Sequence, residues 1–208
     1  MEKVKQLVLI VEDQAINRQI LRHILESEYA VLEAENGRDA LAILDRNHGV
    51  GAILLDLVMP VMDGYEFLRS LKGTSLSSIP VIALTSSRDD KAEQKALDLG
   101  AWDFVPKPYQ ASILMSRLKN VIVRSQFYLI SEMKHLYEHD PLTDLYNRTT
   151  FFSETRLLLD RYPDRKFALV RFDIDEFHLL NSFWGEEEGN RFLRFIAAGL
   201  REIGRAHV

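Results

Sequence analysis

The stretch Leu7-Val8-Leu9-Ile10-Val11-Glu12-Asp13 decides the fold of the first part of this chain. Its apolar run is short and rich in β-branched side chains, which is typical of a strand buried on both faces of a parallel sheet. Two carboxylates follow the run directly. In an open α/β sheet the ligand crevice lies at the carboxyl ends of the strands. We therefore expect Glu12 and Asp13 to line a ligand site.

Three more polar residues stand at or just after the ends of similar apolar runs. They are Asp56 after Ala52-Ile53-Leu54-Leu55, Thr85 after Val81-Ile82-Ala83-Leu84, and Lys107 after Phe104-Val105-Pro106. Because the carboxyl ends of parallel strands meet at one edge of a sheet, these side chains should converge with the first carboxylates. Three carboxylates, a hydroxyl and an ammonium predict a site for a divalent cation and a phosphoryl group.

Helical patterns separate these runs. The periodicity of apolar residues predicts a further strand and several helices, namely a strand at 30–34, a last strand at 102–105, and helices at 14–28, 38–47, 65–71 and 89–99. Strand and helix thus alternate five times. Since right-handed crossovers place helices on both faces, the sequence predicts a doubly wound, five-stranded parallel sheet of the α/β class.

Residues 111–139 contain neither Gly nor Pro and predict one long helix. Seven positions follow one another at alternating spacings of three and four residues, and five of them are apolar: Met115, Leu118, Ile122, Ser125, Leu129, Glu132 and Leu136. We expect the part from Met115 to Ile122 to pack on its own sheet. The distal part is predicted to pair with a second copy as a short coiled coil, which would make a homodimer.

Asp140-Pro141 ends this helix and begins a different region. Its pattern predicts a helix at 150–159, a buried strand from Phe167 to Phe172 and a helix at 187–203. A single strand cannot make a sheet, so this region would expose an unpaired edge.

The composition limits the classes of function. A net charge of −5 argues against non-specific nucleic-acid binding, and no DNA partner is expected. Cysteine is absent, which excludes disulfides and thiolate metal ligands. No apolar run approaches the length that spans a bilayer, and no signal-peptide pattern follows Met1. We expect a cytoplasmic protein without a membrane partner.

The predicted site has a definite chemistry. A cluster of carboxylates suits Mg²⁺, which takes a few protein oxygens and leaves positions for a phosphoryl oxygen. The Asp56 carboxylate could then attack a phosphodonor and form an acyl phosphate. Lys107 would offset the charge of the phosphoryl oxygens, and the Thr85 hydroxyl could donate to one of them.

Residues 5 to about 124 resemble the receiver domain of a bacterial two-component response regulator. The resemblance rests on five motifs: Val11-Glu12-Asp13, Leu55-Asp56-Leu57-Val58-Met59-Pro60, Met62-Asp63-Gly64, Ala83-Leu84-Thr85 and Lys107-Pro108. It implies a flavodoxin-like sheet of strand order 2-1-3-4-5 and a sensor histidine kinase as the phosphodonor. It also implies that Asp56 is the phosphoacceptor.

The same resemblance assigns the remaining roles. It implies that Mg²⁺ is arranged by Glu12, Asp13, Asp56 and the Val58 carbonyl. Thr85 and Lys107 would sense the phosphoryl group. Phe104 stands three residues before the lysine, where the family has an aromatic that changes rotamer with the threonine.

Three alternatives remain for this part. A phosphatase or phosphotransferase of another aspartyl-phosphate fold would commonly have a second aspartate at the position of Val58. A dinucleotide-binding loop at Gly49-Val50-Gly51 would need a third glycine at Leu54 and a strand before it. The receiver could also be a phosphorylation-independent interaction module.

Two later segments resemble the opening of a GGDEF domain, the diguanylate cyclase family. They are Asp140-Pro141-Leu142-Thr143-Asp144-Leu145-Tyr146-Asn147-Arg148 and Phe172-Asp173-Ile174-Asp175-Glu176-Phe177 followed by Asn181. The resemblance makes Asp173 a metal candidate and Asn181 and Asn190 nucleotide candidates. Alternatively, Asp173 and Asp175 only cap the following helix.

This second region departs from the family pattern. The family usually has Lys at His178, Asp at Ser182, His at Glu186 and Asp at Asn190, and the sequence ends before the signature hairpin. We therefore expect a receiver domain at 1–124, a linker helix at 125–139, and a partial GGDEF-like α+β region at 140–208 that neither binds GTP nor acts as an enzyme. The parent protein would carry either a degenerate module ahead of a phosphodiesterase domain or an active, receiver-regulated diguanylate cyclase.

Overall fold

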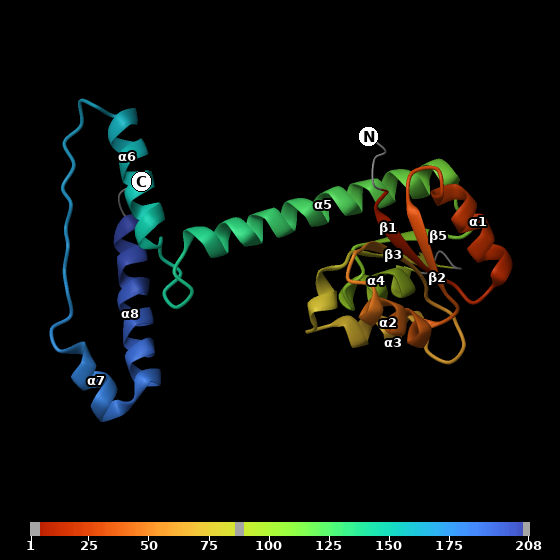
Figure 1. Cartoon of the computed structure of the whole chain (residues 1–208), viewed down its shortest axis with the longest axis horizontal. Helices are drawn as coiled ribbons and strands as arrows, with labels where there is room; N and C mark the ends of the chain where they lie inside the picture. Colours follow the sequence, from red (N-terminus) through yellow and green to blue (C-terminus); the bar gives the residue numbers. More distant parts are fainter. Residues whose placement is uncertain (1–4, 86–89, 206–208) are drawn as a thin grey trace. The chain divides into compact units, whose positions relative to one another are not determined.

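The computed structural model describes residues 5–85 and 90–205 (Figure 1). The chain divides into two compact units, Met1–Tyr128 and Leu129–Val208. The first unit contains a sheet with helices around it, whereas the described part of the second is helical.

The first unit is built on a five-stranded, all-parallel sheet. Its strands are β1 (Leu7–Val11), β2 (Ala30–Ala34), β3 (Val50–Asp56), β4 (Val81–Thr85) and β5 (Asp103–Pro106). Their order is β2-β1-β3-β4-β5. The predicted doubly wound α/β fold and its strand order are therefore confirmed.

Period-two alternation along the strands divides the core into two layers. In β1, Leu9 and Val11 belong to one apolar cluster, while Val8 and Ile10 belong to the other. The first cluster includes residues of α2 (Gly37–Arg46), α3 (Gly64–Leu71) and α4 (Asp90–Asp98); the second includes residues of α1 (Ala15–Leu25) and α5 (Ala111–Glu138). Both faces of the sheet are thus covered, so the strands can be apolar on both sides.

The predicted helices lie where expected, with different ends. The first ends at Leu25 rather than at residue 28, and the third begins at Gly64. A 3-10 helix, η1 (Ser75–Ser78), was not predicted; the Thr74 hydroxyl caps it by accepting from the Leu76 amide at 3.2 Å. The expected start of the fourth helix at Asp89 lies outside the described residues.

The loop after β3 is held close to the end of that strand. Asp63 and Glu66 form a capping box at the start of α3, in which each side chain accepts from the other residue's backbone amide. The Gly64 amide donates to the Leu57 carbonyl at 3.1 Å. A Cβ at Gly64 would lie 2.4 Å from the Asp56 carbonyl oxygen, so only glycine permits this approach.

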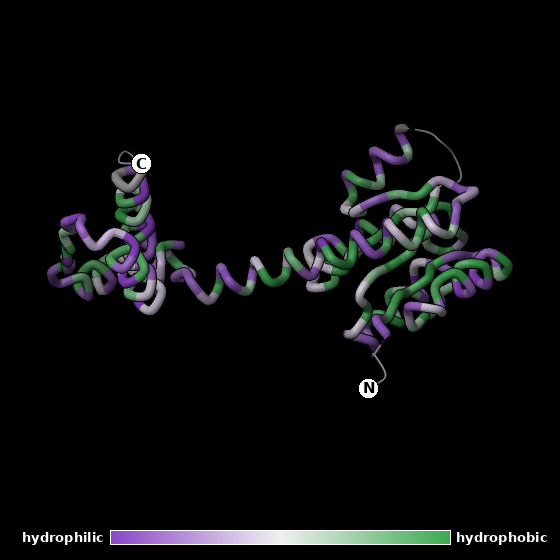
Figure 2. Tube along the Cα trace, turned by 90° about the horizontal axis from the view of Figure 1, so that it is seen from above, coloured by the Kyte–Doolittle hydropathy of each residue, from purple (hydrophilic) through white to green (hydrophobic). Residues whose placement is uncertain are grey.

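The two parts of α5 differ in burial. Leu114, Leu118, Val121 and Ile122 are buried against the sheet, as predicted for this part of the helix. From Phe127 onward the large apolar side chains are exposed. Figure 2 shows hydrophobic and hydrophilic residues following one another along this helix. Among the described residues, neither α5 nor any other helix is both long and apolar enough to cross a membrane.

The second unit contains α6 (Arg148–Arg161), α7 (Phe177–Trp184) and α8 (Glu186–Arg205). The prediction of a buried strand from Phe167 to Phe172 is wrong. This segment is extended but unpaired (Figure 1), and its apolar residues are exposed, Leu169 by 70% and Val170 by 79%. No described segment of the second unit pairs with it through a ladder of backbone hydrogen bonds. An apolar sequence without a partner strand does not make a strand.

We predict that Gly64→Ala destabilises the first unit. The added methyl group would meet backbone atoms of Asp56 and Leu57, which cannot move aside as a side chain can. Overpacking of this kind costs about 1–3 kcal/mol. Urea unfolding should show the loss.

Gly49→Ala is the matched control, because a Cβ at Gly49 meets no atom within 4 Å. A Gly64→Ala protein as stable as the Gly49→Ala protein would contradict the close approach.

Candidate functional site

Polar side chains from three strand ends meet at the carboxyl edge of the sheet. Lys107, just after β5, places its Nζ 2.6 Å from Glu12 Oε2, and the same Nζ lies 2.7 Å from Asp56 Oδ2. Glu12 follows β1, and Asp56 ends β3. The convergence expected from the strand ends is therefore present, with the ammonium between two carboxylates.

Burial makes this charge arrangement unusual. Glu12 is fully buried, and Asp56 is 4% exposed. Burial raises the pKa of Asp56 above its ordinary value, and the neighbouring Glu12 anion adds to the shift, although Lys107 opposes it. The Asp56 carboxylate is thus ionised at a cost that a positive ligand would relieve.

Glu12 and Lys107 shift in the direction that strengthens their pairing. Burial alone would raise the pKa of Glu12, but hydrogen bonds from Lys107 and Asn17 outweigh it and leave that pKa below its usual value. Burial would lower the pKa of Lys107, yet the hydrogen bonds with Asp56 and Glu12 raise it instead. Lys107 therefore stays an ammonium at neutral pH.

Asp13 completes a set of oxygen ligands. Glu12, Asp13 and Asp56 each offer a carboxylate oxygen, and these oxygens lie within 4.8 Å of one another. Asp13 Oδ1 is buried without a hydrogen-bond partner. An all-oxygen set with an unsatisfied anionic atom suits a hard divalent cation such as Mg²⁺. A cation here would also offset the excess of carboxylates over the single ammonium.

Thr85 presents a buried hydroxyl at the end of β4. It is 2% exposed, and its Oγ1 has no hydrogen-bond partner. The Thr85 carbonyl accepts from the Lys107 amide at 2.6 Å, which ties the end of β4 to the residue that follows β5. The hydroxyl is therefore available to donate to an incoming oxygen.

Phe104 and Val58 lie beside these groups. Phe104 pairs with Ala83 in the register of β4 and β5 and packs, half-buried, against the cluster on the α2, α3 and α4 face. The Val58 amide donates to Asp56 Oδ1 at 3.2 Å. A switching role for Phe104 and a ligand role for the Val58 carbonyl stay predictions.

Two residues of the first turns of α1 support the site and were missed in the sequence. Asn17 Nδ2 donates to Glu12 Oε1 at 3.0 Å. Arg18 Nη1 donates to the carbonyls of Glu12 and Asp13, each at 2.8 Å. Both residues follow Asp13 by four and five positions, at the start of the helix after β1. That position could have indicated contacts with the end of β1.

The candidates of the second unit do not form a comparable cluster. Asp173 is exposed, and its Oδ1 accepts only from the Ile174 amide. Asn181 Oδ1 is buried without a partner, close to Gly189. Asn190 lies half-buried on α8. Among the described residues, Asp173 does not lie with two other carboxylate or histidine side chains close enough to hold a metal ion together.

Family models match both parts of the chain. The model described as "Response regulator receiver domain" matches residues 8–119, and the model described as "Diguanylate cyclase, GGDEF domain" matches residues 137–207. The order of the two matches agrees with the two resemblances seen in the sequence.

Individual relatives agree with the family models. Response regulator MprA of Mycolicibacterium vanbaalenii is 36% identical over 120 residues, which are 57% of this chain and 51% of MprA. A probable two-component response regulator/GGDEF domain protein of known structure is 27% identical with a TM-score of 0.55, over 58% of this chain and 50% of that one. The chain thus spans about half the length of these relatives.

A third similar structure is the receiver domain of a sensor histidine kinase from Pseudomonas aeruginosa PAO1. It is 30% identical, has a TM-score of 0.53, and covers 57% of this chain and 98% of its own. That receiver domain holds a magnesium ion coordinated in its active-site cleft.

We predict that Asp56→Asn stabilises the protein at neutral pH when no divalent cation is present. A carboxyl whose pKa is raised by folding favours the folded state when protonated, so its ionised form costs stability above that pKa. The amide removes this charge and keeps an oxygen for Lys107. Thermal unfolding in a chelator should show a higher midpoint than in the parent protein.

The gain should shrink as the pH falls and the parent's Asp56 takes up its proton. Asp45→Asn, an exposed change on α2 that also removes one negative charge, should leave the midpoint nearly unchanged. A lower midpoint for Asp56→Asn at neutral pH would show that the carboxylate stabilises the fold.

Proposed function

The chain belongs to the response regulator receiver family, and from that premise we propose that Asp56 accepts a phosphoryl group in a Mg²⁺-dependent reaction. The observation that carries the proposal is the Lys107 ammonium held between Glu12 and Asp56. Beside it, Asp13 and Thr85 each keep a buried oxygen without a partner. The unpartnered oxygens could bind a cation and donate to a phosphoryl oxygen, and the ammonium could pair with the phosphoryl charge.

The residues divide the work of phosphoryl transfer. Glu12, Asp13, Asp56 and the Val58 carbonyl would hold Mg²⁺, which supplies positive charge as the carboxylate meets the phosphodonor. An Asp56 carboxylate oxygen forms the new bond to phosphorus while the bond from phosphorus to the donor breaks. We propose the phosphohistidine of a sensor histidine kinase as that donor, in cytoplasmic two-component signalling.

The phosphoryl group would change what Lys107 and Thr85 contact. A phosphoryl group brings nearly two negative charges and several acceptor oxygens. Lys107 can exchange its bond with the Asp56 carboxylate for one with a phosphoryl oxygen, and the Thr85 hydroxyl can donate to another. Movement of Thr85 would free space next to Phe104, so a local charge change would reach the surface of α4 and α5.

For the second unit we propose a cyclic di-GMP-related output under the control of the receiver. The match to the GGDEF model over residues 137–207 supports this class of output. The departures at Ser182, Glu186 and Asn190 favour a degenerate module over a working cyclase, because an amide at the last position lacks the charge that pairs with guanine N–H groups. A working diguanylate cyclase remains the second candidate.

We also propose that the distal part of α5 pairs two copies of the chain. Leu129 is 45% exposed, and Ile130, Met133 and Leu136 are each exposed by 60% or more. A helix with so many exposed apolar residues needs a partner surface, and the spacing of Leu129 and Leu136 is one heptad. A second α5 offers the same surface by symmetry.

We predict that the full chain takes up one phosphoryl group from a small acyl-phosphate donor when Mg²⁺ is present. Intact-protein mass spectrometry measures the uptake. Asp56→Asn should abolish it, because the nucleophilic oxygen is replaced by an amide. Asp45→Asn should be phosphorylated like the parent, and an Asp56→Asn protein that still gains the group would refute the assignment.

We predict that Leu129→Glu with Leu136→Glu weakens self-association at least tenfold. Each substitution places a charge where an apolar contact would form, and like charges would face one another across the pair. Sedimentation equilibrium measures the dissociation constant. Gln126→Glu, an exposed charge change on the same helix, is the control. Equal dimer stability in all three proteins, or a monomeric parent, would exclude this interface.

A further inference from the structure

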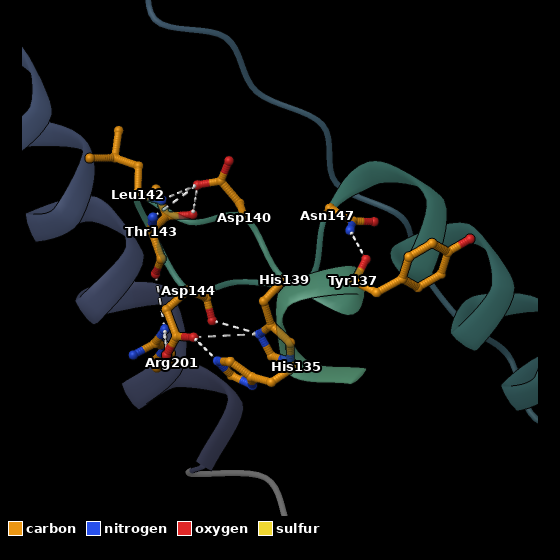
Figure 3. Close-up of polar contacts among 9 residues, drawn as sticks. All are labelled: His135, Tyr137, His139, Asp140, Leu142, Thr143, Asp144, Asn147 and Arg201. Carbon is orange, nitrogen blue, oxygen red and sulfur yellow. Dashed lines mark hydrogen bonds and ion pairs between the residues drawn. The ribbon is translucent and has the colours of Figure 1, made fainter. Parts of the chain in front are cut away.

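His135 lies in the last turn of α5, and His139 directly follows the end of that helix. The rings of His135 and His139 are stacked with their centroids 4.1 Å apart. Figure 3 shows both rings directed toward the turn that follows the helix. Their side chains are 53% and 23% exposed, so solvent and ions can reach them.

Asp144 meets both histidines from that turn. Its Oδ1 lies 2.7 Å from His135 Nε2 and 3.8 Å from His139 Nδ1, and its backbone carbonyl oxygen lies 2.9 Å from the same His139 nitrogen. The backbone at Asp144 is left-handed, with φ 56°, a conformation that Asp tolerates better than most residues. The turn thereby brings a carboxylate to the two imidazoles at and just after the end of α5.

Other contacts fix the turn. Asp140 Oδ1 accepts from the Leu142 amide, the Thr143 amide and the Thr143 hydroxyl. Asn147 Nδ2 donates to the Tyr137 carbonyl at 2.5 Å (Figure 3). The carboxylate of Asp144 is therefore placed by the backbone, and its position does not depend on the histidines alone.

Arg201 of α8 occupies the other side of this carboxylate. Its Nη2 lies 2.6 Å from Asp144 Oδ2 and donates to the Thr143 carbonyl at 2.9 Å. Oδ1 is left facing the two imidazoles. The arginine thus holds one carboxylate oxygen, while the other contacts His135 Nε2 and lies on the side of the His139 ring.

We propose that His135, His139 and Asp144 form a binding site for a divalent transition-metal cation, with Zn²⁺ as the best match. One ligand atom from each residue lies within 4.8 Å of the other two. Two imidazoles and one carboxylate are a donor set that zinc takes in proteins, with water at a fourth position. The cation replaces the hydrogen bond between His135 Nε2 and Asp144 Oδ1, and each histidine binds as a neutral ring.

The chemistry separates this site from the acidic pocket of the first unit. Glu12, Asp13 and Asp56 offer only oxygen atoms, which suit Mg²⁺, whereas imidazole nitrogen favours Zn²⁺ and its neighbours in the first transition row. Excess Mg²⁺ should therefore fill the acidic pocket and leave the histidine site free. The inference does not rest on phosphorylation of Asp56.

A bound cation would cross-link two elements of the second unit, and a third is tied to them through Arg201. It joins the end of α5 to the turn before α6, and Arg201 extends the connection to α8. Because a cation that binds only the folded form stabilises it by mass action, Zn²⁺ should raise the unfolding temperature of this unit.

The test is a calorimetric titration of the full chain with Zn²⁺ in excess Mg²⁺. We expect the parent and Asp56→Asn to bind one equivalent of Zn²⁺. His135→Gln and Asp144→Asn should each weaken binding at least tenfold, since loss of a ligand costs no less than loss of a supporting residue. His178→Gln, an exposed histidine on α7, is the matched control and should bind like the parent.

A second readout uses Co²⁺ in place of Zn²⁺, because its visible absorption reports nitrogen and oxygen coordination. The parent should give an absorption band that His135→Gln lacks, with circular dichroism spectra that match in the absence of metal. A parent that binds no Zn²⁺ overturns the proposal. Unchanged binding in both ligand variants, or an equal loss in His178→Gln, overturns it as well.

Discussion

The candidate site of the first unit depends on one buried arrangement of charge, the Lys107 ammonium between the Glu12 and Asp56 carboxylates. It joins the ends of β1, β3 and β5 across the sheet. Burial alone would push each of these groups toward its neutral form, and their mutual contact opposes this, with help from Asn17 at Glu12. The balance is incomplete, because the pKa of Asp56 remains raised. A site in this condition gains stability from any ligand that brings the missing charge.

The fold creates that site through the alternation of its strands. Along β1, β3 and β4, successive side chains enter opposite apolar layers of the core. The positions before the strand ends are therefore apolar. Polar side chains can turn into the crevice only where the strands end. The close approach of Gly64 to the backbone of Asp56 then brings the loop after β3 over the same edge. Within each strand, the apolar residues therefore form the core, and the polar residues at the strand end form the site.

The same reasoning explains what the sequence predicted and what it did not. Glu12, Asp56 and Lys107 could be found because strand ends are readable from apolar runs, and parallel strands bring those ends together. Asn17 and Arg18 were missed because their role depends on how α1 turns back over β1. The strand expected from Phe167 to Phe172 was wrong, since strand formation requires a partner that a local pattern does not report. The histidine cluster needed a turn of known geometry to bring Asp144 to the end of α5.

The sequence of α5 contributes both to the core of the receiver and to the proposed metal site. Its first part supplies apolar residues to the core of the receiver, its last turn supplies His135, and His139 directly follows its end. A phosphoryl group on Asp56 and a cation at the histidines would influence each other only if each binds one state of the chain better than the other. That coupling must be reciprocal. If a phosphoryl group on Asp56 raises the affinity for the cation, the cation favours phosphorylation at equilibrium by the same factor. Two ligands with unlike donor preferences could then act on one helix without competing for a site.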